Sequence, residues 1–143
     1  MSRSGSLCLL LHSHMPYVEG FGTWPFGEEW LFEAVASSYV PLLEVLDGVA
    51  VTVTVTPVLA DQFEVMRHGE AGDRFLSFLR EVRALVHDED ARELEAAGDG
   101  ELAAELRRAA ADYERADAFF ESHGRDLLGA FARLDGVELW TSA

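Results

Sequence analysis

Residues 49–56 read Val-Ala-Val-Thr-Val-Thr-Val-Thr, and Pro57 follows them. Strict alternation of β-branched residues predicts a β-strand, and proline, which cannot donate to a strand ladder, ends it. Upstream, the short apolar run Leu7–Leu11 stops at polar residues, a pattern typical of a strand buried on both faces of a parallel sheet. Cys8 lies inside that run and is predicted to be a small core residue.

A helix is predicted between these two strands. Glu28 and Glu29 precede apolar residues that recur three and four positions apart as far as Leu46, and acidic residues suit a helix amino terminus. Pro41 interrupts the pattern, so a kink or a restart is expected near Val40. Strand, helix and strand in this order predict a parallel pair joined by a crossover, and therefore an α/β fold.

The remainder of the chain is predicted to be helical up to a final strand. Apolar spacing predicts one helix that begins behind an Asp73 cap and runs to about Val86, and a longer one over residues 101–134. Residues 137–141, Val-Glu-Leu-Trp-Thr, follow a glycine and predict a third strand.

Composition narrows the function classes. The 143 residues carry 11 basic and 26 acidic side chains, a formal charge of −15. Such a charge repels phosphate backbones and anionic lipid, so neither nucleic acid nor a membrane is expected as a partner. His12 and His14 cut the amino-terminal apolar run far below signal-peptide or membrane-span length, and one cysteine allows no intrachain disulfide. A cytoplasmic location is therefore expected.

His12 and His14 are the strongest candidates for a functional site. They lie two positions apart at the carboxyl end of the first predicted strand, so both imidazoles project from one face. In α/β barrels, the carboxyl ends of the strands form the active site. A His-x-His pair also occurs in metal-dependent hydrolases. That reading stays open as an alternative, although no Asp-rich partner motif near a strand end completes a metal set.

The segment after the first strand is rich in glycine, proline and aromatic residues, which predicts a long loop. Aromatic faces match the C–H faces of sugar rings, and the candidates for a stacking surface are Tyr17, Phe21, Trp24, Phe26 and Trp30. Glycoside chemistry needs two carboxyl groups. Glu28, Glu29 and Glu33 are explained by a solvated helix start, and Glu19 alone in the loop makes no pair.

Five stretches resemble glycoside hydrolase family 57, and in particular the amino-terminal region of its branching enzymes. They are Leu11–Val18 (Leu-His-Ser-His-Met-Pro-Tyr-Val), Trp24–Ala34 (Trp-Pro-Phe-Gly-Glu-Glu-Trp-Leu-Phe-Glu-Ala), Tyr39–Leu43, Val55–Ala60 and Val137–Ala143. The resemblance implies that residues 1–143 are the amino-terminal part of a seven-stranded (β/α) barrel with helical insertions. It also implies retaining transfer of α-1,4-glucan segments into α-1,6 branches, without metal or cofactor.

The resemblance also assigns site residues. His12 falls on an active-site histidine that holds the sugar next to the nucleophile, and Trp30 is similar to a tryptophan that lines the glucan-binding groove. His14 is the next substrate-binding candidate, and Trp24 is expected to help shape the same loop as Trp30. The family's nucleophile and acid/base fall beyond Ala143. The chain is therefore expected to be a partial product that is inactive alone, with an α-glucan such as amylose or a glycogen-like polymer and the remaining part of the barrel as partners. Alternatives are a family 57 α-amylase or 4-α-glucanotransferase, the metal-dependent hydrolase, and a non-catalytic glucan-binding remnant.

Overall fold

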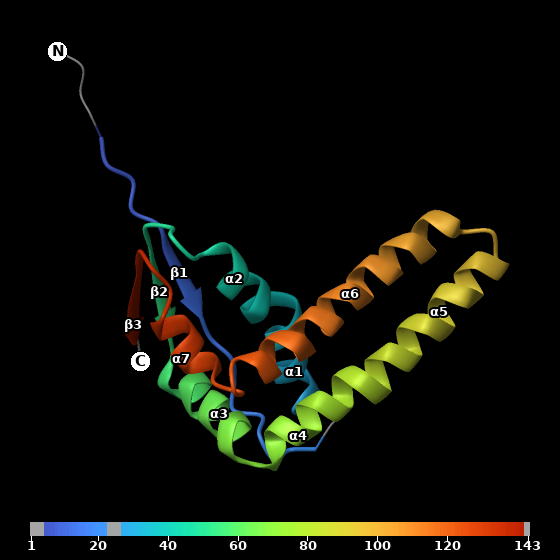
Figure 1. Cartoon of the computed structure of the whole chain (residues 1–143), viewed down its shortest axis with the longest axis horizontal. Coiled ribbons are helices and arrows are strands. Elements are labelled where there is room, and N and C mark those ends of the chain that lie inside the picture. The colour runs from blue at the N-terminus through green and yellow to red at the C-terminus, as the bar shows by residue number, and fades with distance from the viewer. Residues whose placement is uncertain (1–4, 23–26, 142–143) are drawn as a thin grey trace.

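The computed structural model describes residues 5–22 and 27–141. The elements follow in the order β1 (Leu10–Ser13), α1 (Glu29–Ala34), η1 (Val35–Tyr39), α2 (Val40–Val45), β2 (Val51–Val55), α3 (Pro57–His68), α4 (Glu70–Ser77), η2 (Phe78–Arg83), α5 (Ala84–Ala96), α6 (Gly100–Ser122), α7 (Leu127–Ala132) and β3 (Val137–Thr141). The strands and shorter helices form a body, from which α5 and α6 project as a long hairpin (Figure 1). Among the described helices, none combines the length and apolarity needed to cross a membrane.

The three strands form one parallel sheet in the order β1-β2-β3. β2 lies in the centre, where Thr54 faces His12 on one side and Trp140 on the other. This arrangement confirms the α/β class and the parallel pairing predicted from the strand–helix–strand order. The third strand also has the predicted bounds.

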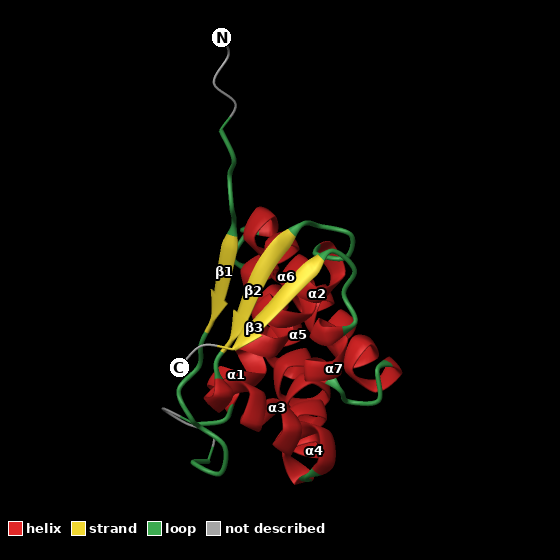
Figure 2. Cartoon of the chain, turned by 90° about the vertical axis from the view of Figure 1, so that its left-hand side faces the viewer, coloured by secondary structure: helices red, strands yellow, loops and turns green. Residues whose placement is uncertain are grey.

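The helices cover a single face of this sheet. Val51, Val53 and Val55 are at most 5% exposed and belong to the hydrophobic core. Figure 2 shows the strands in front and the helices behind them, with the opposite face of the sheet left open. Because side chains alternate along a strand, His12 and Thr54 belong to the open face.

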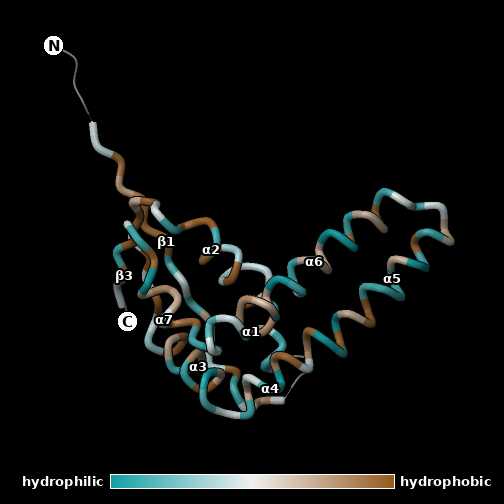
Figure 3. The backbone as a smooth tube through the Cα atoms, in the orientation of Figure 1, coloured by the Kyte–Doolittle hydropathy of each residue, from teal (hydrophilic) through white to brown (hydrophobic). Residues whose placement is uncertain are grey.

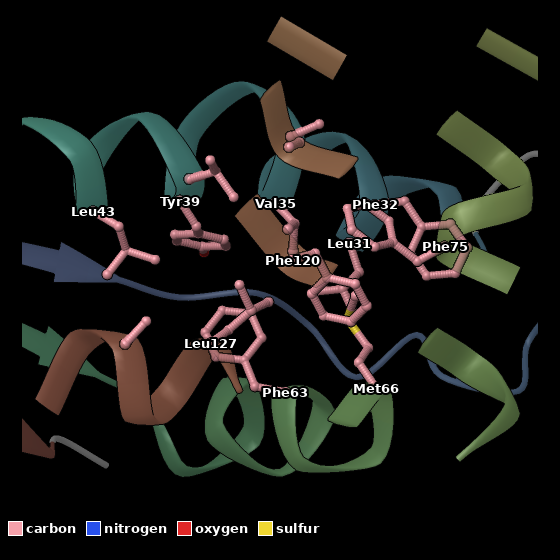
Figure 4. Packing of buried hydrophobic residues seen from close by; sticks show 14 of the residues in the cluster. Leu31, Phe32, Val35, Tyr39, Leu43, Phe63, Met66, Phe75, Phe120 and Leu127 are labelled. Carbon is pink, nitrogen blue, oxygen red and sulfur yellow. The ribbon is translucent and has the colours of Figure 1, made fainter. Parts of the chain in front are cut away.

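Aromatic side chains from different helices pack against one another in the core (Figure 4). Phe63 of α3 stacks on Phe131 of α7 at a centroid distance of 6.4 Å. Phe75 of α4 meets Phe120 of α6 edge-on at 5.1 Å. Offset-stacked and edge-to-face pairs are the arrangements that aromatic quadrupoles favour. The first pair joins α3 to α7, and the second joins α4 to α6.

The first strand differs from its prediction. β1 begins three residues later than expected, and Leu7 and Leu9 are 94% and 55% exposed, with Cys8 exposed as well. β1 is an edge strand of a sheet that has one open face, so an apolar run there is not buried on both sides. The prediction of a doubly buried strand and a core cysteine is wrong for the chain as it stands.

The predicted kink before Pro41 is confirmed. The first helix changes to a π-helical turn over η1, and α2 restarts at Val40 with the proline in its first turn. Proline has no N–H for the α-helical ladder and its ring crowds the carbonyl four residues earlier, here that of Ser37 in η1, which explains why the helix widens just before it.

Two helix starts differ from the prediction. Pro57 ends β2 as expected, but it also opens α3, a helix that the sequence analysis did not identify. Proline suits the first turn of a helix, where its missing N–H has no partner in any case. The next helix starts at Glu70 after Gly69, so Asp73 is not its cap. Asp73 instead accepts a hydrogen bond from Arg125 Nη1 at 2.7 Å.

The helix predicted over residues 101–134 is two helices. α6 ends at Ser122, and both Gly124 and Arg125 adopt a φ of 63°. The chain then starts α7 behind Asp126, whose carboxylate accepts a hydrogen bond from Gly129 N at 2.7 Å. A side-chain acceptor at this position is a helix start signal, and the turn lets Leu127 reach the core.

Only the base of the hairpin joins the core. Ala116 and Phe120 near the end of α6 are fully buried, whereas Leu102 near its start is 51% exposed. Hydropathy alternates along both helices of the hairpin (Figure 3). A surface cavity of about 420 Å³ is lined by hairpin residues together with η2, and a second of about 690 Å³ is lined by hairpin residues alone. The hairpin is therefore an arm attached to the body through one buried end.

Replacing Phe120 by alanine should show which end of the arm matters for folding. Removing a fully buried phenylalanine leaves a cavity and costs about 3–5 kcal/mol of unfolding free energy. Leu102→Ala on the same helix should change it by less than about 0.5 kcal/mol because that side chain is half exposed. Urea denaturation followed by circular dichroism measures both, and equal losses would contradict the description of the arm.

Candidate active site at the carboxyl edge of the sheet

His12 and His14 lie together at the end of β1. Their rings are nearly parallel, with an interplanar angle of 6° and centroids 6.3 Å apart. His12 Nδ1 is hydrogen-bonded to Thr54 Oγ1 of β2 at 2.7 Å. Both imidazoles are exposed. The shared face predicted from the two-residue spacing is therefore present.

A second polar pair lies on the same open face, two residues closer to the amino ends of the strands. The hydroxyl of Thr52 donates to Glu138 Oε2 of β3 at 3.3 Å, and Trp140 follows on β3 in register with Thr54. Sequence analysis did not identify Glu138 or Trp140 as site residues. Alternation along the third strand, which places both on the side of His12, is the signal that could have found them.

The loop after β1 presents several aromatic side chains. Tyr17 is 45% exposed, Phe21 73% and Trp30, at the second position of α1, 46%. Figure 2 places this loop and α1 beside the carboxyl ends of the strands. Trp24 and Phe26, which the sequence predicts for the same surface, lie outside the described residues.

Glu28 is the anchor of that loop, not a solvated helix cap. Its carboxylate is 4% exposed and receives two hydrogen bonds from Arg74 of α4, at 2.7 Å from Nε and 2.6 Å from Nη2. Gly20 N also donates to it at 3.1 Å. Burial by itself raises the pKa of Glu28, but the bonds from Arg74 and Gly20 outweigh it and lower the pKa. The carboxylate therefore stays ionised and ties the loop to α4.

Gln62 of α3 anchors the beginning of the loop. Its side chain is fully buried, accepts a hydrogen bond from Val18 N at 2.8 Å and donates to the carbonyl of Pro16 at 3.1 Å. Loop backbone that is buried needs such partners. The loop is thus held to the helices at its beginning and, through Glu28, at its end.

Two further acidic side chains, one in the loop and one in α1, have structural contacts. Glu19 accepts a hydrogen bond from Tyr17 OH at 3.1 Å, which raises the pKa of Tyr17. Glu33, predicted to be solvated, is contacted by Arg83 and by the hydroxyl of Tyr113. Across residues 5–22 and 27–141, no three His, Cys, Asp or Glu side chains gather closely enough to hold a metal ion.

The chain is similar in sequence to known proteins, although no protein-family model matches it. The 1,4-alpha-glucan branching enzyme of Thermococcus kodakarensis is 40% identical in an alignment of 91 residues that covers 59% of this chain and 13% of that enzyme. The chain therefore spans a small part of the length of this relative.

Solved structures match nearly the whole chain. The crystal structure of a GH57-type branching enzyme from Pyrococcus horikoshii superposes with a TM-score of 0.83 at 32% identity, covering 97% of this chain and 27% of that one. The alpha-amylase AmyC of Thermotoga maritima superposes with a TM-score of 0.72 at 22% identity, covering 94% and 26%. The latter likeness concerns the fold alone.

Arg74→Met should weaken the attachment of the aromatic loop. It leaves the buried Glu28 carboxylate with Gly20 N–H but without its two bonds from the partly exposed Arg74, and a buried acceptor that loses its partners costs about 2 kcal/mol. Arg80→Met is the matched control, because Arg80 of η2 makes the same two-bond contact at 2.6 Å to Asp117 of α6. This contact is exposed, and exposed pairs contribute less than about 1 kcal/mol. Urea denaturation measures both losses. If the control lost as much as Arg74→Met, Glu28 would not be a buried anchor.

Proposed function

Because this chain is homologous to the amino-terminal part of glycoside hydrolase family 57 branching enzymes, we propose that the protein containing it is a 1,4-alpha-glucan branching enzyme. The observation that carries the proposal is the match to the Pyrococcus horikoshii enzyme over 97% of the chain at a TM-score of 0.83. The branching enzyme of Thermococcus kodakarensis supports it with 40% identity.

In this proposal, the three parallel strands are the first three of a seven-stranded (β/α) barrel. The helices would form part of its outer layer and the open face of the sheet part of its interior. The open face supports this reading, because it carries polar groups on β1, β2 and β3 while the covered face carries the apolar core. In such barrels the carboxyl edge holds the active site.

The reaction would be a retaining transfer by double displacement. A nucleophilic carboxylate attacks the anomeric carbon and keeps the transferred segment as a glycosyl ester, while the acid/base group protonates the 4-oxygen of the remaining donor chain, which leaves. A 6-hydroxyl of the acceptor, deprotonated by the same group, then displaces the carboxylate. We assign both catalytic carboxyl groups to sequence outside these 143 residues. Glu28 is committed to Arg74, and Glu19 accepts a hydrogen bond from Tyr17 and lies 3.6 Å from the same Arg74 guanidinium. This chemistry requires no cofactor.

The residues of this chain would bind and orient the glucan. His12 would hold the sugar beside the nucleophile, since it projects from the open face at the edge of the sheet. His14 would contribute from the adjoining parallel ring. Trp30 would line the glucan groove, which its half-exposed indole at the start of α1 supports, and Trp24 is proposed for the same loop.

The product formed from amylose tests the proposal. A branching enzyme should create α-1,6 linkages with little increase in reducing ends, whereas an α-amylase releases reducing ends steadily. Linkage analysis by proton NMR together with a reducing-end assay separates the two. Steady hydrolysis without branches would overturn the proposal, and loss of activity in chelator would favour the metal-dependent hydrolase that uses His12 and His14.

His12→Ala in the protein that contains this chain should lower kcat about 100-fold. Removing one hydrogen-bond donor aimed at developing transition-state charge has an effect of roughly that size. The fold should remain, because His12 is exposed at an edge strand. His68→Ala, on the exposed end of α3, is the control and should leave kcat unchanged. Turnover near the wild-type value in His12→Ala would remove His12 from the site.

A further inference from the structure

Thr54 is placed to control the orientation of His12. The two residues are register partners on neighbouring strands, and both side chains lie on the open face of the sheet. The Thr54 side chain is buried, with 4% of the residue exposed, while the ring that it contacts is exposed. The 2.7 Å bond between Oγ1 and Nδ1 is therefore made from a fixed, central strand to a side chain on an edge strand.

The direction of this hydrogen bond follows from the partners of the hydroxyl. A threonine hydroxyl has one hydrogen to donate, and burial makes an unused donor costly. Within the described residues, Thr54 Oγ1 has only His12 Nδ1 as a partner. The arrangement that satisfies the hydroxyl is donation to Nδ1, which leaves the ring proton of neutral His12 on Nε2.

The neighbouring row provides an internal comparison. Thr52 lies on the same strand and face and is 8% exposed, but its hydroxyl donates to the carboxylate of Glu138. The two hydroxyls on β2 are therefore hydrogen-bonded to different strands: Thr54 to His12 of β1, and Thr52 to Glu138 of β3. A variant at either position removes one hydroxyl from β2, but only the variant at Thr54 removes a contact to His12.

We infer that Thr54 is the positioning residue for His12: its hydroxyl donates to Nδ1, holds neutral His12 as the Nε2–H tautomer and presents that N–H at the carboxyl edge of the sheet. An N–H donor fixed in this way suits the hydroxyl and ring oxygens of a sugar. The tautomer is inferred from the geometry of this chain alone, whereas the effect on turnover also rests on the proposed function.

The tautomer is measured by NMR of the chain labelled with 15N-histidine at pH 8, where an ordinary imidazole is neutral. The His12 signal is the one missing from the His12→Ala spectrum. We expect Nε2–H in the wild type, loss of that preference in the isosteric Thr54→Val, and its return in Thr54→Ser. Thr52→Val should leave the signal unchanged. Two results would overturn the inference. The first is a wild-type ring protonated on Nδ1, a measurement that does not depend on the folding of any variant. The second is an unchanged tautomer in Thr54→Val.

Turnover on amylose is then compared in the protein that contains this chain. Thr54→Val should lower kcat by about 10- to 100-fold, the scale of a misplaced catalytic contact, with little change in KM. Thr54→Ser should recover most of the loss, and His68→Ala, outside the site, should keep the wild-type kcat. Wild-type kcat in Thr54→Val beside an impaired His12→Ala would overturn the positioning role, whereas wild-type kcat in both would overturn the role proposed for His12 instead.

Discussion

The position of every helix on one face of the sheet is the constraint on which the rest of the structure depends. Parallel strands are joined by right-handed crossovers, and the order β1-β2-β3 advances in one direction across the sheet. Two crossovers of the same hand that advance the same way must lie on the same side. The valines of β2 are therefore buried under helices, while Thr52 and Thr54 are left to interact with side chains of the flanking strands.

That constraint also decides where the loop after β1 must be held. It leaves the sheet at the carboxyl edge and has to present exposed aromatic rings, which contribute little packing of their own. Two buried polar side chains supply the attachment. Gln62 binds its beginning through backbone groups, and Glu28 binds its end together with Arg74. A buried ion pair is a weak source of net stability, but it favours one geometry because neither partner tolerates being left alone.

Features with a local cause could be predicted from the sequence, and features with a distant cause could not. The alternation in β2, the bounds of β3 and the restart before Pro41 depend on neighbouring residues. The role of Glu28 depends on Arg74, 46 residues away, and that of Glu138 on Thr52, 86 residues away. The helix that begins at Pro57 was missed for another reason, because a proline that ends a strand is also suited to start a helix.

The arm of α5 and α6 is connected to the site region through the other end of α1. Glu33, three residues after Trp30, is contacted by Arg83 at the foot of the arm and by the hydroxyl of Tyr113 on α6. The ring of His87 packs against Tyr113 at 4.9 Å, and burial together with Arg83 lowers the pKa of His87 and favours its neutral form. The short helix α1 is consequently fixed at its start by α4, through Glu28, and at its end by the arm, through Glu33. The helix that carries the half-exposed Trp30 is thus held on both sides of that residue by charge pairs from different parts of the chain.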